Sequence, residues 1–245
     1  MRAEDLLVLL HDTATNVRGA LDGLADWGLA GTRAGQYRCD LAADDAALAV
    51  LERAHVGVLS EESGLRFGDR PVVVVVDPVD GSTNAAAGLP WYATSLCAVD
   101  GDGPVVAVVV NQATGVRYEA IRGEGARVDG VAVQTSGCTR LDEAVVGLSG
   151  LPVRNLGWWQ FRALGASALD LCAVASGALD AFIDCSVDAH GPWDYLGGLL
   201  VCHEAGALVR DAQDRPLLDI GHGVRRTPIA AATPALLGEI SAAMN

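Results

Sequence analysis

Two aspartates, Asp77 and Asp80, directly follow the apolar run from Val72 to Val76. Five consecutive valines predict a strand that is buried on both faces. Two carboxylates at the end of such a strand are poorly hydrated and raise each other's pKa unless a cation compensates them. A hard divalent ion bound through oxygen atoms is the usual partner. The residue types and their spacing therefore indicate a metal site.

A solvated turn is the alternative interpretation of the same residues. Asp-Pro and Asp-Gly are turn dipeptides, and the stretch from Asp77 to Gly81 taken alone favours a reversal after a strand. A second acidic pair, Glu61-Glu62, follows the short apolar stretch Val56 to Leu59 and favours the metal site instead. If the two strands are parallel neighbours, both acidic segments lie at one edge of the sheet, where open α/β sheets bind their ligands.

A third carboxylate, Asp194, opens a segment that has the length and the closing glycine, Gly206, of a helix. Asp is among the preferred helix N-caps, so a structural role is one interpretation. The other interpretation has the carboxylate at the start of the helix, pointing toward the metal. The sequence leaves both open.

Three ordered motifs resemble those of the inositol monophosphatase family: Glu61-Glu62-Ser63, the segment from Asp77 to Thr83, and Trp193-Asp194 ahead of a glycine-rich helix. The similarity extends to 165–175, which resembles the family's substrate-facing helix, and to 122–126, which resembles its central hairpin region. The resemblance implies an αβαβα layered fold of the mixed α/β (α+β) class. It also implies a Mg²⁺-dependent, commonly lithium-sensitive phosphomonoesterase.

The resemblance also assigns roles to single residues. Five of them would bind the metal, four through carboxylates and one through its carbonyl oxygen: Glu61, Asp77, Asp80, Asp194 and Val79. Glu61 and Ser82 would orient the attacking water, and Ser82 stands where the family more often has Thr. The residues expected to contact the substrate are Gly81, Ser82, Thr83, Gly165, Ala166, Ser167 and Asp184, with Asp188 as the competitor of Asp184.

The chain departs from the family pattern in two places. The family usually carries a Lys and a Thr-x-x-Asp element ahead of the Glu-Glu pair, and here both the Lys and the Thr are missing. Asp40 is the better match for the Asp of that element and Asp44 the second, although both could equally be solvated or helix-capping residues. We expect Asp40 and Glu62 to lie behind the metal ligands. The stretch 147–162 is shorter than in the family, which has some of its dimer contacts there, so a homodimer is an open expectation.

Hydrophobic periodicity predicts helices and strands along the whole chain. Helices are expected at 4–29, 42–54, 166–176, 194–205 and 234–244. Strands are expected at 56–59, 72–76, 93–99, 105–111, 116–121, 144–148, 180–183, 207–210 and 229–232. The chain is expected to form a single phosphatase unit, with an α+β metal and phosphate part at 1–140 and an α/β part at 141–245.

Composition excludes several classes of protein. The 245 residues are 51% apolar and 20% charged, which is typical of a globular chain. A net charge of −14 argues against a nucleic-acid binder, and the absence of lysine excludes a Schiff-base enzyme and a Walker-type phosphate loop. The apolar runs are too short for a membrane span and the N-terminus lacks the pattern of a signal peptide, so we expect a cytoplasmic protein without a membrane partner.

Cysteines and histidines give no further site in the sequence. The six cysteines show neither a C-x-x-C pair nor zinc spacing, which predicts reduced, mostly buried thiols. The five histidines are scattered, and we expect none to be catalytic. His190 alone lies near a predicted ligand and is placed, at most, at the rim of the substrate site.

The expected reaction is hydrolysis of a small phosphorylated metabolite by metal-activated water, without a covalent intermediate. Asn84 after Thr83 resembles the inositol monophosphatase branch and favours an inositol monophosphate as substrate. Histidinol phosphate, fructose 1,6-bisphosphate and adenosine 3′,5′-bisphosphate stay open, because related enzymes with this scaffold hydrolyse them. The alternative of another class is an inactive homologue that acts as a binding or regulatory subunit.

Overall fold

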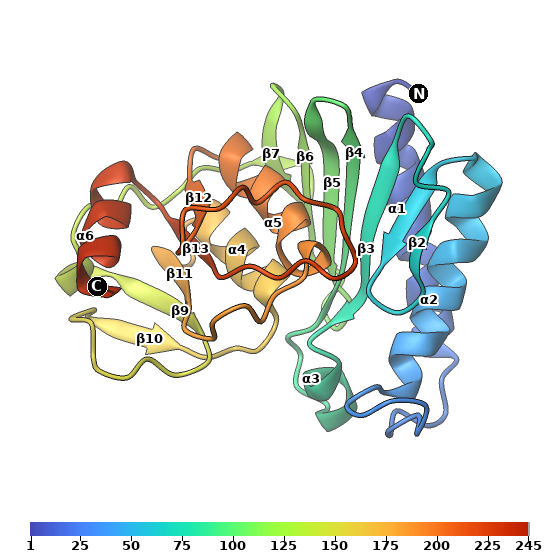
Figure 1. Ribbon diagram of the computed structural model, residues 1–245, viewed down its shortest axis with the longest axis horizontal. Helices are drawn as coiled ribbons and strands as arrows, with labels where there is room; N and C mark the ends of the chain where they lie inside the picture. The colour runs from blue at the N-terminus through green and yellow to red at the C-terminus, as the bar shows by residue number, and fades with distance from the viewer. Residues whose placement is uncertain (245) are drawn as a thin grey trace.

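The computed structural model describes residues 1–244, which form five stacked layers (Figure 1). Helices α1 (Ala3–Asp22) and α2 (Arg38–Leu51) cover one face of an eight-stranded sheet. Helices α4 (Ser167–Ala175) and α5 (Pro192–Glu204) lie between that sheet and a five-stranded sheet. Helix α6 (Pro234–Met244) packs on the outer side of the second sheet. This αβαβα order confirms the expected fold class.

The eight-stranded sheet brings the predicted acidic segments together. Its strands, in the order β2-β1-β3-β4-β5-β6-β7-β8, are β1 (Gly57–Ser60), β2 (Gly64–Arg66), β3 (Val73–Asp80), β4 (Ala93–Asp100), β5 (Gly103–Asn111), β6 (Arg117–Ile121), β7 (Gly125–Val128) and β8 (Val131–Ala132). Strands β1 and β3 pair in parallel, with Ser60 opposite Val76. As expected from the sequence, the residues that follow both strands therefore lie at the same edge of the sheet.

The five-stranded sheet has the order β10-β9-β11-β13-β12. Its strands are β9 (Val145–Ser149), β10 (Gln160–Arg162), β11 (Ala181–Asp184), β12 (Leu208–Asp211) and β13 (Pro228–Ala231). Strand β9 pairs in parallel with both β10 and β11, whereas β13 is antiparallel to β11 and β12. Strand β11 ends at Asp184, close to the start of α5.

The middle layer forms the core between the two sheets. Every residue of α4 is buried, and so are most residues of α5. Helix α4 packs on the second sheet and α5 on the first, and the two helices pack against each other, so most of their surface is covered. Pro192 occupies the first turn of α5, where its fixed φ favours helix initiation. The start of α5, and with it Asp194, is therefore held in a defined place.

Gly198 allows α5 to pack closely against α4. A Cβ at this position would lie 2.6 Å from Leu171 Cβ and 3.2 Å from the carbonyl oxygen of Ala168. We expect Gly198→Ala to lower the free energy of unfolding by about 1–3 kcal/mol, the usual cost of overpacking, in urea titrations. Gly238→Ala on α6 is the matched control, because no neighbouring atom lies within 4 Å of its Cβ position. If Gly198→Ala is as stable as the wild-type protein, the close contact between the helices is wrong.

Several boundaries differ from those expected. Helix α1 ends at Asp22 rather than at 29, because Gly23 caps it through hydrogen bonds to main-chain carbonyls. Helix α2 begins at Arg38 rather than at 42, since the Asp40 carboxylate accepts a hydrogen bond from the Tyr37 N–H at 2.8 Å. Elements missed in the sequence are the short helix α3 (Ser82–Ala87), the 3₁₀ helix Leu141–Glu143, and strands β2, β7, β8 and β10. The 3₁₀ helix Glu52–Ala54 falls within the helix expected at 42–54.

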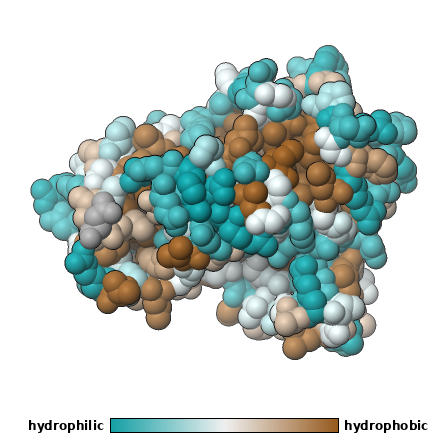
Figure 2. Space-filling view, viewed as in Figure 1, coloured by the Kyte–Doolittle hydropathy of each residue, from teal (hydrophilic) through white to brown (hydrophobic). Residues whose placement is uncertain are grey.

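The surface drawn in Figure 2 is largely hydrophilic, with an apolar area near its centre. The shortened stretch 147–162 lies apart from that area, on the β9 and β10 side of the molecule (Figure 1), and carries the exposed apolar side chains of Leu151, Val153, Trp159 and Phe161. Exposed apolar groups that gather in this way mark interaction surfaces, and the homodimer stays a prediction. Over residues 1–244, every helix falls short of the length or the apolarity that crossing a bilayer requires.

Candidate active site

An irregular strand end places Asp77 and Asp80 on the same side of the sheet. Strict alternation along a strand would point residues three apart to opposite faces. The register between β3 and β4 shifts between Asp77, which lies opposite Ser95, and Asp80, which lies opposite Ala93. Such a bulge re-aims side chains and also accommodates Pro78 within the strand. Asp77 is 1% and Asp80 7% exposed, so the solvated-turn interpretation does not hold.

Asp194 joins the two aspartates from the start of α5. Carboxylate oxygens of Asp77, Asp80 and Asp194 lie within 4.8 Å of one another. One oxygen of Asp194, Oδ2, accepts a hydrogen bond from the N–H of Gly191 at 2.6 Å and thereby caps the helix. The two interpretations of this residue are therefore compatible, because one carboxylate both caps α5 and faces the other acids.

Glu61 approaches the same cluster from the end of β1. Its N–H donates to the carbonyl oxygen of Val76 at 3.2 Å, which holds it beside β3, and its side chain is 35% exposed. A cavity of about 240 Å³ is lined by residues from four separate stretches of the chain: Glu61, Asp77, Val79, Asp80, Gly81, Ser82, Thr83, Gly165 and Asp194. The structure thus brings together all five predicted metal ligands.

The pKa values of these carboxylates are raised. Burial is the main cause for Asp77 and Asp80, whose pKa values lie well above their usual range, and neighbouring carboxylates add to the effect. Burial also raises the pKa of Asp194. The pKa of Glu61 rises to about 8, first through burial and then through the charge of Asp194. Carboxylates that are buried close together and have raised pKa values bind either protons or a cation.

The donor set fits a hard divalent cation. Asp77 Oδ1 is buried and has no hydrogen-bond partner within residues 1–244. A buried carboxylate oxygen left without a partner is costly, and a cation in the cavity would satisfy it. The neighbouring donors are oxygens, which suit Mg²⁺ or Mn²⁺ rather than softer ions. Asp77, Asp80, Asp194 and Glu61 would hold such an ion.

The start of α3 forms the wall of the cavity where phosphate is expected. Gly81 precedes the helix with a φ of 85°, and a Cβ there would lie 2.9 Å from the carbonyl oxygen of Gly165. Only glycine fits this close approach. Asn84 donates from Nδ2 to the carbonyl oxygens of Trp91 and Leu164, so it holds the turn before Gly165 in place. The first N–H groups of a helix have no partners within the helix and suit an anion.

Asp40, rather than Asp44, reaches this site. Burial raises the pKa of Asp40 to about 6, and Asp40 lines a cavity together with Ser82 and Glu61. Asp44 instead accepts a hydrogen bond from Ser60 Oγ at 2.5 Å, and it lines neither the acidic cavity nor the one beside it. Asp40 therefore lies behind Ser82, in agreement with its better match to the family's aspartate.

Arg33 places a cation beside the Glu61-Glu62 pair. Its Nη2 lies 2.8 and 2.9 Å from the two carboxylate oxygens of Glu62 and 3.9 Å from Glu61 Oε1. Gln36 also donates to Glu62, whose side chain is only 4% exposed. No sequence pattern predicted this contact, because Arg33 lies in a loop almost thirty positions before Glu62. Glu62 is thus held by protein groups next to Glu61.

A second cavity, of about 390 Å³, adjoins the first through Glu61 and Ser82. Its far wall comes from the segment between β12 and β13, which runs across the front of the molecule in Figure 1. His222 Nε2 lies 3.1 Å from the carbonyl oxygen of Glu61, and Arg225 lies over the Trp193 ring at 5.0 Å. Sequence reasoning missed these residues, which no motif marks.

Asp184 is not open to the cavity. It is fully buried, with Oδ1 accepting from the N–H of Ser186 at 2.8 Å and Oδ2 lying 2.7 Å from His190 Nδ1. His190 Nε2 in turn lies 2.7 Å from Ser167 Oγ. The competing residue Asp188 pairs with Arg215 at 2.7 Å. His190 is 8% exposed and so lies beneath the site rather than at its rim.

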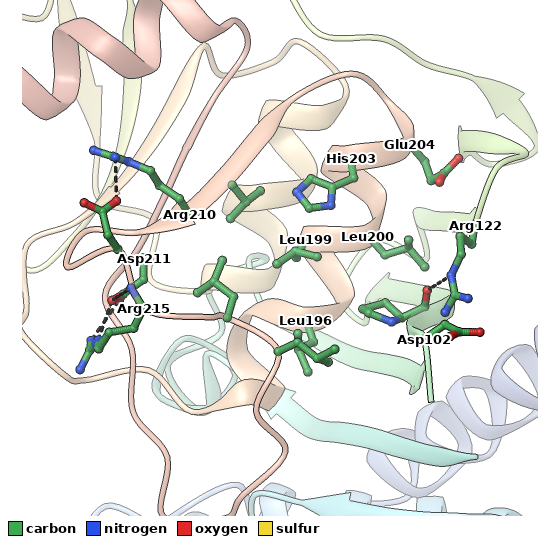
Figure 3. A pocket seen from close by; sticks show the side chains of 15 residues that line it. Asp102, Arg122, Leu196, Leu199, Leu200, His203, Glu204, Arg210, Asp211 and Arg215 are labelled. Atoms are coloured by element: carbon green, nitrogen blue, oxygen red, sulfur yellow. Dashed lines mark hydrogen bonds and ion pairs between the residues drawn. The ribbon is translucent and has the colours of Figure 1, made fainter. Parts of the chain in front are cut away.

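A larger cavity, of about 480 Å³, lies along the later turns of α5 (Figure 3). Leu196, Leu199 and Leu200 form its floor. The arginines at its edge are already paired, Arg210 with Asp214 and Arg215 with Asp211. Its apolar floor and paired charges offer no chemistry comparable to that of the acidic cavity.

Known proteins resemble this chain in sequence and in structure. The sequence model of the inositol monophosphatase family matches residues 36–244. The fructose-1,6-bisphosphatase/inositol-1-monophosphatase of Methanothermobacter thermautotrophicus is 33% identical over 216 residues, which cover 79% of this chain and 77% of that protein. The Nus factor SuhB of Pasteurella multocida is 30% identical over 220 residues, covering 82% and 79%.

Among solved structures, an extragenic suppressor from Pyrococcus furiosus is 27% identical and superposes with a TM-score of 0.85, covering 98% of this chain and all of that one. The family match spans most of the chain and includes the β1, β3 and α5 segments that build the acidic cavity. The chain belongs to the inositol monophosphatase family.

Proposed function

We propose that this protein hydrolyses small phosphate monoesters with Mg²⁺ and that an inositol monophosphate is its favoured substrate. The observation that carries the proposal is the gathering of Asp77, Asp80 and Asp194 within 4.8 Å, beside Glu61 and the first turn of α3. A divalent cation held there supplies charge neutralisation and makes hydroxide available near neutral pH. A relative named fructose-1,6-bisphosphatase/inositol-1-monophosphatase supports the same reaction class.

The chain's own residues position the reactants. Glu61 and Ser82 line both cavities and hold the attacking water between them. The N–H groups of Gly81, Ser82 and Thr83 receive the phosphate at the start of α3. Asp77, Val79 and Asp80 are the buried part of the cavity lining, where charge interactions are stronger than in bulk water. Phosphoryl transfer needs mainly this positioning and charge neutralisation.

A phosphate-release assay with and without Mg²⁺ tests the proposal. The panel holds inositol 1-phosphate, fructose 1,6-bisphosphate, histidinol phosphate and adenosine 3′,5′-bisphosphate. We expect Mg²⁺-dependent release that is fastest with inositol 1-phosphate. Faster turnover of another ester would change the substrate but keep the reaction class. No release from any ester would refute the enzyme and favour a binding or regulatory subunit.

The hydroxyl of Ser82 is expected to matter because it orients the water together with Glu61. Ser82→Ala should lower kcat about 10- to 100-fold, the usual range for removing a group that orients a reactant beside a metal. Ser82→Thr is the matched control, because it keeps the hydroxyl, and should have a mild effect. Steady-state phosphate release measures both. An Ala variant with unchanged kcat would remove this role.

A further inference from the structure

A hydrogen-bonded chain of Ser167, His190 and Asp184 lies beside the acidic cavity. The Oγ of Ser167 lies 2.7 Å from His190 Nε2, and His190 Nδ1 lies 2.7 Å from Asp184 Oδ2. All three residues are buried and come from different elements: α4, the segment before α5, and β11. Such a chain fixes the imidazole ring and links a buried carboxylate to a hydroxyl.

Ser167 follows closely after Gly165, a residue that lines the acidic cavity but not the second cavity, which Glu61 and Ser82 border. Glu61 and Ser82 border the second cavity as well as the first, whereas Asp80 and Gly165 border only the first. Ser167 is the first residue of α4, two positions after Gly165, and the N–H of the next residue, Ala168, donates to Asp80 Oδ2 at 2.7 Å. In-line displacement places the leaving oxygen opposite the attacking water. The leaving oxygen therefore lies on the side of Gly165 and Ser167.

We propose that Ser167, His190 and Asp184 form a relay that protonates the leaving oxygen of the phosphate ester. This relay rests on the proposed function above. As the bond between phosphorus and the leaving oxygen breaks, its electron pair stays on that oxygen. The Ser167 hydroxyl gives its proton to the oxygen, and His190 Nε2–H gives its proton to Ser167 Oγ. Asp184 stays a carboxylate and holds His190 Nδ1–H throughout. His190 regains a proton from solvent between turnovers.

The surroundings of His190 favour its protonated form. Burial alone would lower the pKa of His190, but the hydrogen bond with Asp184 and the charges of Asp194 and Asp80 outweigh burial and raise it. Asp170 on α4 adds a fourth carboxylate that interacts with the ring. A cation that compensates the charges of Asp80 and Asp194 removes their effect on the pKa of His190, but the hydrogen bond between His190 and Asp184 remains. With both ring nitrogens donating, the Ser167 hydroxyl keeps its own proton to give away.

The relay makes Ser167 a catalytic residue and His190 and Asp184 positioning residues that act through it. This differs from the arrangement of serine hydrolases, in which the same three residue types activate the serine as a nucleophile. A nucleophilic Ser167 would be required for every substrate. A proton-donating Ser167 is required only when the leaving group needs a proton.

The experiment compares each ester of the panel that the enzyme hydrolyses with the analogue in which sulfur replaces the bridging oxygen. A thiolate leaves without a proton, while the rest of the substrate and its contacts are the same. We expect Ser167→Ala and His190→Gln to lower kcat for the oxygen ester about 100-fold, at the low end for general acid catalysis. Turnover of the sulfur ester should be nearly unchanged.

Ser149→Ala is the matched control. Ser149 Oγ lies 3.5 Å from His190 Nε2 but outside the relay, so both esters should be turned over at wild-type rates. Equal loss of both esters in Ser167→Ala would overturn the relay in favour of a structural, substrate-binding or nucleophilic serine. An unchanged oxygen ester would overturn it as well. Failure of the wild-type protein to hydrolyse any ester would instead refute the proposed function itself.

Discussion

Asp80→Asn is expected to lower Mg²⁺-dependent phosphate release about 10³-fold, because it removes a carboxylate that faces the cation site from β3. Metal ions stabilise the transition state of hydrolysis by several kcal/mol, and losing about 4 kcal/mol corresponds to this factor. Asp194→Asn should have an effect of the same size. Phosphate release at saturating substrate and a titration with Mg²⁺ measure the loss.

The folded structure of both variants should persist. Asparagine keeps an oxygen that can accept from the Ala168 N–H in place of Asp80 or from the Gly191 N–H in place of Asp194. Each substitution also removes one of several repelling charges, so the metal-free protein should be equally stable or slightly more stable. Asp45→Asn is the control, because Asp45 is exposed on α2. Full activity in either site variant would contradict the metal assignment.

Mg²⁺ is expected to raise the melting temperature, and to raise it more at pH 8 than at pH 5. The folded-state pKa of Glu61 lies at about 8, against 4.5 for an unperturbed group, and those of Asp77 and Asp80 are also raised. Between the unfolded-state and the folded-state pKa values, these carboxyl groups hold protons in the folded protein that they have released in the unfolded chain. Stability of the metal-free protein therefore falls as pH rises from about 4.5 to about 8.

A bound cation replaces those protons and restores the lost stability. At a Mg²⁺ concentration 100 times the dissociation constant, the gain is about 2.7 kcal/mol, or about 5–10 °C in Tm for a chain of this size. Thermal unfolding followed by circular dichroism over this pH range, with Mg²⁺ and with chelator, measures the effect. In Asp194→Asn, the increase in melting temperature caused by Mg²⁺ should be smaller than in the wild-type protein. If Mg²⁺ leaves the melting temperature of the wild-type protein unchanged at pH 8, the assignment of the metal site is wrong.

The chemistry of the site could be predicted from short stretches of sequence. Asp77 and Asp80 after a run of valines, and Glu61 after a second strand, indicated oxygen ligands at one edge of a sheet, and the parallel pairing of β1 and β3 places them there. The resemblance of three short motifs to those of a known family also implied the layered fold. These features are local, because burial of a strand and the start of a helix depend on neighbouring residues.

Other contacts could not be predicted, because they join segments far apart in the chain. The register shift that turns Asp77 and Asp80 to one side depends on pairing between β3 and β4. Burial of Asp184 depends on how β11 packs under α4, and only that packing shows that His190 lies between Asp184 and Ser167. The pairing of Arg33 with Glu62 likewise exists only once the loop before α2 lies against β1.

The sequence by itself therefore determined which residues can bind a metal, their oxygen chemistry and the order of the layers. The tertiary structure decided which of the buried acids face the cavity and which face another side chain. The physical reason is that a side chain's residue type sets what it can bind, whereas its direction is set by bulges, helix starts and packing between distant segments.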